Sequence, residues 1–357
     1  MRTIKCFKLN SASWTRTALC LAVCMFGLSL SAIAKGPTYI TFDVPGAAPG
    51  CCQGTQPYAI SVTGAVVGTY ITADNVSHGF LRTPGGAIVK FDPPGASTTF
   101  VYSINLEGTI VGEYYDEQGG DHGFIRSPSG TITPFDLPGA LATWLPAIND
   151  LGIIAGGYVD NTGNVDAFLR MPGGKVTSFD APGVGTWLTF IDLGTGLSPL
   201  GEVSGAFIDQ YGEHSFVRLP TGALTEFDVP GSTSNSASSV NLLGTVVGDY
   251  TDDNTSFTHG FVRDPFGHIK TWDAPLAGPP FGTRMEANAP NGAFVGFYDD
   301  ITANGYAKAF VHSPNGVTTT LLPPLAVASV AYGINPFGLV TGWYSDGNTI
   351  HGFVWIP

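Results

Sequence analysis

Short apolar runs separated by turn residues recur along the chain, and the stretch from His122 to Gly139 shows the pattern in full. Two apolar runs, each with a phenylalanine, flank Ser129-Gly130 in this stretch. Glycine can take the positive φ that a tight hairpin turn needs. The pattern therefore predicts a β-hairpin in which Phe124 and Phe135 lie opposite each other.

The same hairpin returns at regular intervals, with the first phenylalanine of each copy 43 to 49 residues after the previous one. These residues are Phe80, Phe124, Phe168, Phe216, Phe261, Phe310 and Phe353. A glycine with an aromatic residue two positions later precedes each hairpin, as in Gly112 and Tyr114. One unit therefore reads as four short strands, which in the second unit are expected near Thr99–Asn105, Thr109–Tyr115, His122–Ser127 and Thr131–Asp136.

Units of this length with four strands each are typical of propeller blades. The sequence therefore predicts an all-β fold, a seven-bladed β-propeller over residues 35–357. After the predicted signal peptide, the first strand, Tyr39 to Gly46, matches the fourth strand of a unit. The last strand, His351 to Ile356, matches the third strand of a unit. We expect the N-terminal strand to complete the last blade and close the ring, with Phe42 facing Phe353. A six- or eight-bladed propeller and a β-solenoid are the alternatives.

Residues 1–34 have the pattern of a secretory signal peptide. Basic residues from Arg2 to Arg16 precede an apolar run, Thr17 to Ile33, and Ala32-Ile33-Ala34 places small residues at the cleavage site. The alternative is a single anchoring helix, because the run is nearly long enough to span a bilayer. We expect a secreted, periplasmic or cell-surface protein.

Charge and cysteine content narrow the choice of partner. Of 15 basic residues four lie in the predicted signal peptide, so 11 remain against 28 acidic residues, a net charge of −17. This balance disfavours nucleic acid and anionic membranes as partners, and the mature chain has no second apolar segment. Cys51 and Cys52 form a candidate disulfide, although adjacent Cα atoms lie only about 3.8 Å apart and such a bond is strained. Intermolecular bridging is the alternative.

The repeated unit Ile-Asn…Gly-x-Val-Gly-x-Tyr…His-Gly-Phe-x-Arg resembles the extracellular HAF-repeat family, named for His-Ala-Phe. The resemblance covers essentially the whole chain after the signal peptide, and the chain departs from the family's name by using Gly where it has Ala. It implies a secreted, propeller-like bacterial repeat protein and implies no general activity.

The polar residues that recur in the repeat are interpreted as structural. Phe-Asp-x-Pro-Gly ends the fourth strand of most units, where Asp bonds nearby amides and Pro-Gly makes a turn. His starts the third strand at His78, His122, His214, His259 and His351, and one His per blade cannot meet the others at a single metal. Arginines two residues after the phenylalanine, such as Arg126, are expected to pair or stack between blades. Asp- and Asn-rich loops between the second and third strands leave calcium as a possible ligand.

The sequence contains no nucleophile elbow, zinc spacing, phosphate loop or dinucleotide fingerprint, so it predicts no catalytic residue, metal site or other cofactor. Segments that break the repeat are the better site candidates: Cys51-Cys52, Trp187 to Gly201 and Pro275 to Arg284. They point to the face formed by the loops between second and third strands and between consecutive units. The candidate binding residues are Asp116, Asp121, His122, Asp160, Trp187, Asp252 and Arg284.

We expect a binding or scaffold module for an unknown protein or glycan. Two alternatives stay open. One is an enzyme that acts on a glycan or small molecule through acidic residues on that face, and the other is a structural surface protein that self-associates through its rim.

Overall fold

Every regular element in the described part of the chain is a β-strand, which confirms the predicted all-β class. The computed structural model describes residues 36–181, 188–191, 196–252, 257–279, 282–303 and 305–357, with the backbone alone at 51–52 and 188–191. The predicted signal peptide and Trp187 lie outside these ranges. Tyr39–Pro357 forms one compact unit.

The strands follow the repeat closely and are short, as the spacing of apolar runs and turns requires. Their bounds are β1 Thr38–Phe42, β2 Gly50–Ile60, β3 Val66–Ile71, β4 Ser77–Arg82, β5 Ile88–Phe91, β6 Ala96–Ile104, β7 Ile110–Asp116, β8 Asp121–Arg126, β9 Ile132–Phe135, β10 Ala142–Ile148, β11 Ile154–Val159, β12 Val165–Arg170, β13 Val176–Phe179, β14 Leu188–Ile191, β15 Val203–Asp209, β16 Gly212–Arg218, β17 Leu224–Phe227, β18 Ser232–Val240, β19 Val246–Asp252, β20 Thr258–Arg263, β21 Ile269–Trp272, β22 Thr283–Asn288, β23 Phe294–Asp299, β24 Ala307–His312, β25 Thr318–Leu321, β26 Ala328–Ile334, β27 Val340–Ser345 and β28 Thr349–Ile356.

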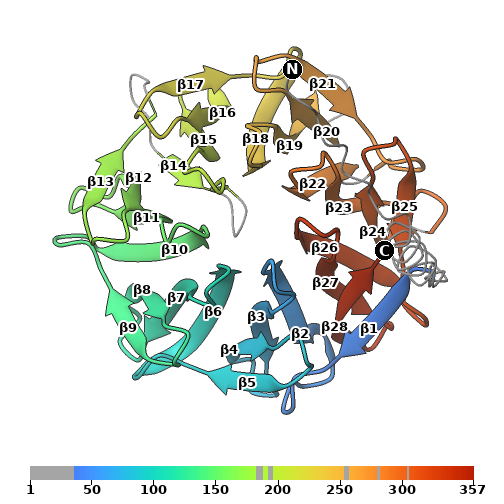
Figure 1. Ribbon diagram of the computed structural model, residues 1–357, viewed down its shortest axis with the longest axis horizontal. Helices are drawn as coiled ribbons and strands as arrows, with labels where there is room; N and C mark the ends of the chain where they lie inside the picture. Colours follow the sequence, from blue (N-terminus) through green and yellow to red (C-terminus); the bar gives the residue numbers. More distant parts are fainter. Residues whose placement is uncertain (1–35, 182–187, 192–195, 253–256, 280–281, 304) are drawn as a thin grey trace, which may run out of the picture. The chain divides into compact units, whose positions relative to one another are not determined.

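Four consecutive strands pair antiparallel in each unit, from β2–β5 through β22–β25. Figure 1 shows these groups following one another around a common centre, with the first strand of each group innermost and the fourth outermost. Neighbouring units also touch through short parallel pairings, such as that of Ala142 with Asp121. The last strand, β28, pairs with β27, β1 and β2, so the two ends of Tyr39–Pro357 lie side by side. The described strands form three sheets of 8, 16 and 4 strands, and none of these is closed.

The hairpin register differs by one residue from the prediction. Phe124 pairs with Pro134, and Phe135 pairs with Gly123. The turn is a three-residue loop in which Gly130 has a φ of 94°, the left-handed position that follows a type I turn. Because side chains alternate along a strand, this shift sends the two phenylalanines to opposite faces of the sheet. The predicted pairing was therefore wrong, and the prediction that Phe42 faces Phe353 falls with it: Phe42 lies against Gly352.

The shifted register joins neighbouring units. Each fourth-strand aromatic packs on the buried third-strand phenylalanine of the next unit, as Phe135 does on Phe168 with ring centroids 5.8 Å apart. The recurring arginine stacks on the same ring, with the Arg170 guanidinium carbon 5.4 Å from the centroid of Phe135. The third-strand phenylalanines have no exposed surface. The predicted stacking of the arginines between units is confirmed.

An Asn recurs in the turn between the first and second strands, and it links neighbouring units at that end of the strands. The Asn149 side-chain oxygen accepts from the backbone N–H of Ile153, while its Nδ2 donates to the carbonyl of Ser198 in the next unit at 2.9 Å. Asn335 does the same across the chain ends and donates to the Ser61 carbonyl at 3.0 Å. Both amides are buried, so each turn is tied to its neighbour by bonds shielded from water.

Candidate functional site

The predicted residues Asp116 and His122 meet in a cluster at the outer edge of the second unit. His122 Nδ1 lies 3.0 Å from Asp136, its Nε2 lies 3.4 Å from Asp116, and its ring stacks on Tyr114 at 5.1 Å. Burial opposes the charged imidazolium, but the hydrogen bonds and charges of the two aspartates outweigh it and raise the pKa of His122. Asp116 also accepts from the backbone N–H groups of Gln118 and Gly120, which orders the loop.

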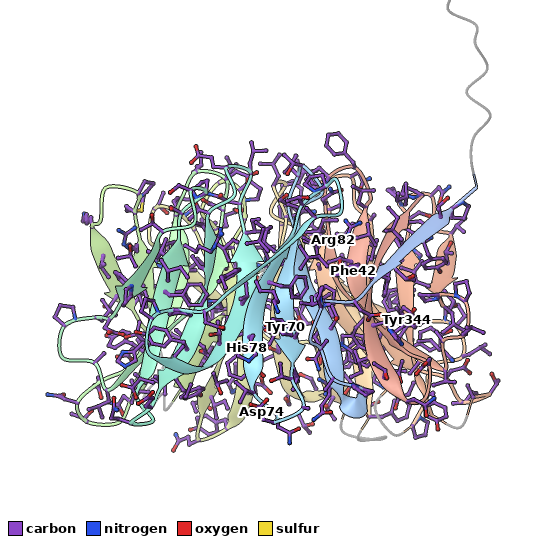
Figure 2. The ribbon with its side chains drawn as sticks, turned by 90° about the horizontal axis from the view of Figure 1, so that it is seen from below. Phe42, Tyr70, Asp74, His78, Arg82 and Tyr344 are labelled. Carbon is purple, nitrogen blue, oxygen red and sulfur yellow. The ribbon has the colours of Figure 1, made fainter. Side chains whose placement is uncertain are left out.

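The same cluster recurs wherever the third strand starts with histidine. The Nδ1 partners lie 2.8–3.0 Å away and come from the fourth-strand end: Asp92 for His78, Asp136 for His122, Asp228 for His214, Asp273 for His259 and Asp43 for His351. Figure 2 shows the cluster of the first unit, with His78 beneath Tyr70 and Asp74 at the edge of the molecule. A contact repeated in five units holds strands together, and we assign these residues a structural role.

The other predicted residues are dispersed. Asp160 accepts from the backbone N–H groups of Thr162 and Asn164 and so closes its own loop. Asp252 lies 3.5 Å from His259. Cys51 and Cys52 belong to β2, but their side chains fall outside the described residues, as does Trp187, so the disulfide stays a prediction.

Asp121 is the one predicted carboxyl with a strongly altered environment. It starts β8 and faces β10, where burial and then the charge of Glu113 raise its pKa to about 7. Burial also raises the pKa of Glu113, which accepts a hydrogen bond of 2.6 Å from Tyr102. The Asp121 Oδ1 atom is buried and has no hydrogen-bond partner among the described residues.

A polar cleft opens where the repeat breaks, between β16, β18, β19 and β22, at the predicted loop face. It holds about 260 Å³ and is lined by Glu213, Ser234, Ser236, Asp249, Tyr250, Thr251, Thr258 and the predicted Arg284. Glu213 accepts from the Ser234 hydroxyl at 2.6 Å. The Arg284 side chain is exposed, so its guanidinium is open to solvent at the mouth.

A second cleft of about 310 Å³ shares Glu213 and extends toward the outer edge. Asn235 lies at its base and is 2% exposed. Its Nδ2 donates to Asp228 at 2.9 Å, and its Oδ1 has no hydrogen-bond partner among the described residues. Tyr211 lines the opening and is 80% exposed. We call the two cavities together the serine clefts.

A sequence signal for the serine clefts existed in the first strand of the fifth unit. Ser232–Val240 reads STSNSASSV, whereas the corresponding strand of the second unit reads ASTTFVYSI. The serines replace Phe100 and Tyr102 of that unit. The prediction followed the loops that break the repeat and therefore found Arg284 but not Glu213, Ser234 or Asn235.

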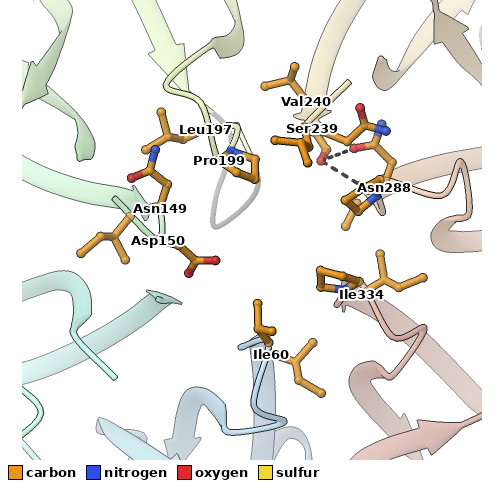
Figure 3. Close-up of a pocket in the computed structure, with 16 residues that line it drawn as sticks. Ile60, Asn149, Asp150, Leu197, Pro199, Ser239, Val240, Asn288 and Ile334 are labelled. Atoms are coloured by element: carbon orange, nitrogen blue, oxygen red, sulfur yellow. Dashed lines mark hydrogen bonds between the residues drawn. The ribbon is translucent and has the colours of Figure 1, made fainter. Parts of the chain in front are cut away.

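The opposite face carries a separate depression at the centre (Figure 3). It holds about 160 Å³ and is lined chiefly by the ends of first strands and the turns after them, including Ile60, Leu197, Val240 and Ile334. The Asp150 carboxylate at its edge accepts from the Leu106 backbone N–H at 2.7 Å. The depression therefore has a more apolar lining than the serine clefts, and its edge carboxylate is engaged with the backbone of the neighbouring unit.

The described residues include no group of three or more His, Cys, Asp or Glu side chains placed to hold a metal ion. Within the same ranges there is no helix with the length and hydrophobicity of a membrane span.

Comparison with known proteins supports the fold. No protein-family model and no curated protein matches the sequence, so the HAF resemblance stays a prediction. The chain is similar to the BP39L lectin from Burkholderia pseudomallei, with a TM-score of 0.51 and 10% identity over 83% of this chain and 92% of the lectin. It is similar to a prolyl endopeptidase (TM-score 0.58, 12% identity, 85% of this chain) and a puromycin hydrolase variant (0.50, 14%, 82%), and it spans half the length of each. At these identities the likeness shows the fold alone, which is that of β-propeller proteins.

Proposed function

We propose that the chain is a secreted binding module, built as a seven-bladed β-propeller of the HAF-repeat kind, that holds a glycan in the serine clefts. The N-terminal strand completes the last blade in this proposal, and the ring closes there by packing and hydrogen bonds.

Four contacts between the chain ends support the closed ring. Strand β1 pairs with β28, and His351 of the last unit bonds Asp43 just after β1 at 2.8 Å. Phe42 packs on Phe80 of the first unit with ring centroids 6.0 Å apart. Asn335 donates across the junction as the other asparagines do between successive units. The junction thus repeats the contacts found elsewhere, which is what a closed ring of equal blades requires.

Secretion is supported by the basic start, apolar run and small residues of the first 34 positions. N-terminal sequencing of the protein recovered from the extracellular fraction should begin at Lys35. Recovery of an uncleaved chain from the membrane fraction would favour the anchoring helix instead.

The binding role rests on one observation, the serine clefts. The repeated polar side chains bond or stack on other residues within and between units. In the serine clefts, by contrast, hydroxyls, carboxylates and a guanidinium line open cavities where the repeat is broken. Such groups match the hydroxyls of a sugar, and an exposed Tyr211 at the opening offers a ring for its apolar face. The similar BP39L protein is a lectin, which supports a binding role on this fold.

A glycan array probed with the mature protein, with and without calcium, tests the proposal. We expect binding that Arg284→Ala and Glu213→Gln weaken at least tenfold with an unchanged melting temperature. Lys175→Ala is the matched control, because it removes one positive charge from an exposed turn before β13. Equal loss in the control, or binding only to peptides, would contradict the proposal, and a calcium requirement would add that ion to the site.

An enzyme is the second candidate, because Asp121 and Glu113 combine two raised pKa values with proximity. Glycosidases use a protonated carboxyl group together with a second acidic residue nearby. Hydrolysis of chromogenic glycosides that Asp121→Asn abolishes would establish this role. Activity that survives the substitution would remove it.

A further inference from the structure

The repeat breaks in another place, at the junction of the fifth and sixth units, and leaves a cavity there. It holds about 510 Å³ on the face opposite the serine clefts. Trp272, Phe294 and His312 line it together with Asp264, His268 and Lys270. Its size and its mixture of aromatic walls with a few polar groups are those of small-ligand sites.

At five other junctions the corresponding space contains an arginine of the chain. The guanidinium carbons lie 4.6 to 5.4 Å from the ring centroid of the fourth-strand phenylalanine before them. The pairs are Arg82 on Phe42, Arg126 on Phe91, Arg170 on Phe135, Arg218 on Phe179 and Arg263 on Phe227. The fold therefore places a planar cation on an aromatic face at this position.

At this junction both partners are changed. Trp272 stands in place of the phenylalanine, and His312 stands in place of the arginine, two residues after Phe310. The shorter His312 packs on Phe294 with ring centroids 4.7 Å apart, and its Nδ1 bonds the Thr318 hydroxyl at 2.8 Å. The imidazole meets Trp272 at a steep interplanar angle of 63°, so it does not stack on the indole as the guanidinium would.

Of the charged side chains that line the cavity, Asp264 favours a bound cation and Lys270 opposes it. Asp264 is held ionised because bonds from His268 and the backbone lower its pKa. Burial and then the charge of Lys270 lower the pKa of His312, so the imidazole is neutral at pH 7. The Lys270 ammonium is exposed and can swing away into solvent.

We propose that this cavity binds a guanidinium group from another molecule, free or on a peptide, in the place that an arginine of the chain occupies at five other junctions. Tryptophan gives the strongest cation–π attraction of the aromatic side chains, and Asp264 supplies the counter-charge. The site lies on the other face from the serine clefts, so the proposal does not depend on the proposed function.

Calorimetric titration with arginine amide tests the site, and citrulline amide is the matched uncharged probe. We expect arginine amide to bind at least tenfold more tightly, which corresponds to about 1.4 kcal/mol. Equal binding of the two amides, binding of inorganic phosphate in preference to either, or no heat from arginine amide would each overturn the proposal.

Two variants locate the site. His312→Arg restores the arginine of the other junctions, so it should abolish binding while the melting temperature stays equal or rises. Lys270→Gln removes the opposing charge and should tighten binding severalfold, a result that does not depend on how His312→Arg folds. Unchanged affinity in a folded His312→Arg, or weaker binding in Lys270→Gln, would contradict the assignment.

Discussion

The histidine clusters at the outer edge and the serine clefts between the fourth, fifth and sixth units are both rich in polar side chains, but they differ in what those side chains contact. His122 is held on three sides by Asp136, Asp116 and Tyr114, and the arrangement recurs around the molecule. Asn235 and Arg284 belong to one place only, where a buried amide and an exposed side chain line open cavities. In a repeat protein, a contact that recurs in most units stabilises the fold, and the exceptions identify candidate sites.

The chain junction should show the largest effect of any structural contact. Phe42→Asp would remove the packing on Phe80 and place a carboxylate among apolar side chains. We expect a loss of about 2–4 kcal/mol, since removal of a buried Phe costs about 3–5 kcal/mol and Phe42 is only partly buried. Urea melting with size-exclusion chromatography measures it.

Ile40→Asp is the control for this experiment, because Ile40 lies on the same strand and is 37% exposed. Similar stability of the two variants, with both monomeric, would show that β1 does not close the ring.

Asp121 gives the next largest effect, and its sign is unusual for an aspartate. Its folded pKa of about 7 lies above the unfolded value, so folding favours the protonated form and the free energy of unfolding falls as pH rises from about 4 to 7. Asp121→Asn should therefore stabilise the protein at pH 8, by about 1–2 kcal/mol after allowance for partial exposure, and leave it unchanged near pH 3.5. Urea melts at both pH values measure this difference.

Asp160→Asn is the contrasting variant, because hydrogen bonds from Thr162 and Asn164 lower the pKa of Asp160. This substitution should destabilise the protein at pH 8. If Asp160→Asn and Asp121→Asn shift stability in the same direction, the burial argument fails for Asp121.

The edge clusters should affect stability modestly and binding not at all. His122→Ala should cost about 0.5–1.5 kcal/mol, the usual range for lost hydrogen bonds. The folded pKa of His122 is raised, so the charge-dependent part of this stability is present below about pH 6.5 and is lost as pH rises through the folded pKa. The loss in His122→Ala should therefore be larger at pH 5.5 than at pH 9. Loss of glycan binding in His122→Ala at an unchanged melting temperature would show that the histidine cluster is a binding site.

The smallest stability effect belongs to the serine clefts. Arg284→Ala should change the free energy of unfolding by less than about 0.5 kcal/mol, because the side chain is exposed. The same variant should show the largest loss of binding. A marked drop in melting temperature would show that Arg284 has a structural role, like the residues of the histidine clusters.

The strand order, the unit length and the structural role of the repeated His, Asp and Arg side chains could all be predicted from the amino-acid sequence. These follow from periodicity, because alternation, turn residues and spacing are local properties of the chain. The hairpin register could not be predicted from the sequence. A two-residue and a three-residue loop around Gly130 shift the pairing by one position, and the spacing of the phenylalanines does not distinguish them.

Which of the non-repeated residues lie close together depends on the tertiary structure. Glu213, Asn235 and Arg284 come from three different units, and Trp272 and His312 from two, so no local pattern places them together. Their substitution was visible in the sequence, but its consequence depends on the space left between units. That space is set by packing across the junctions, where a serine in place of a phenylalanine or a histidine in place of an arginine leaves a cavity.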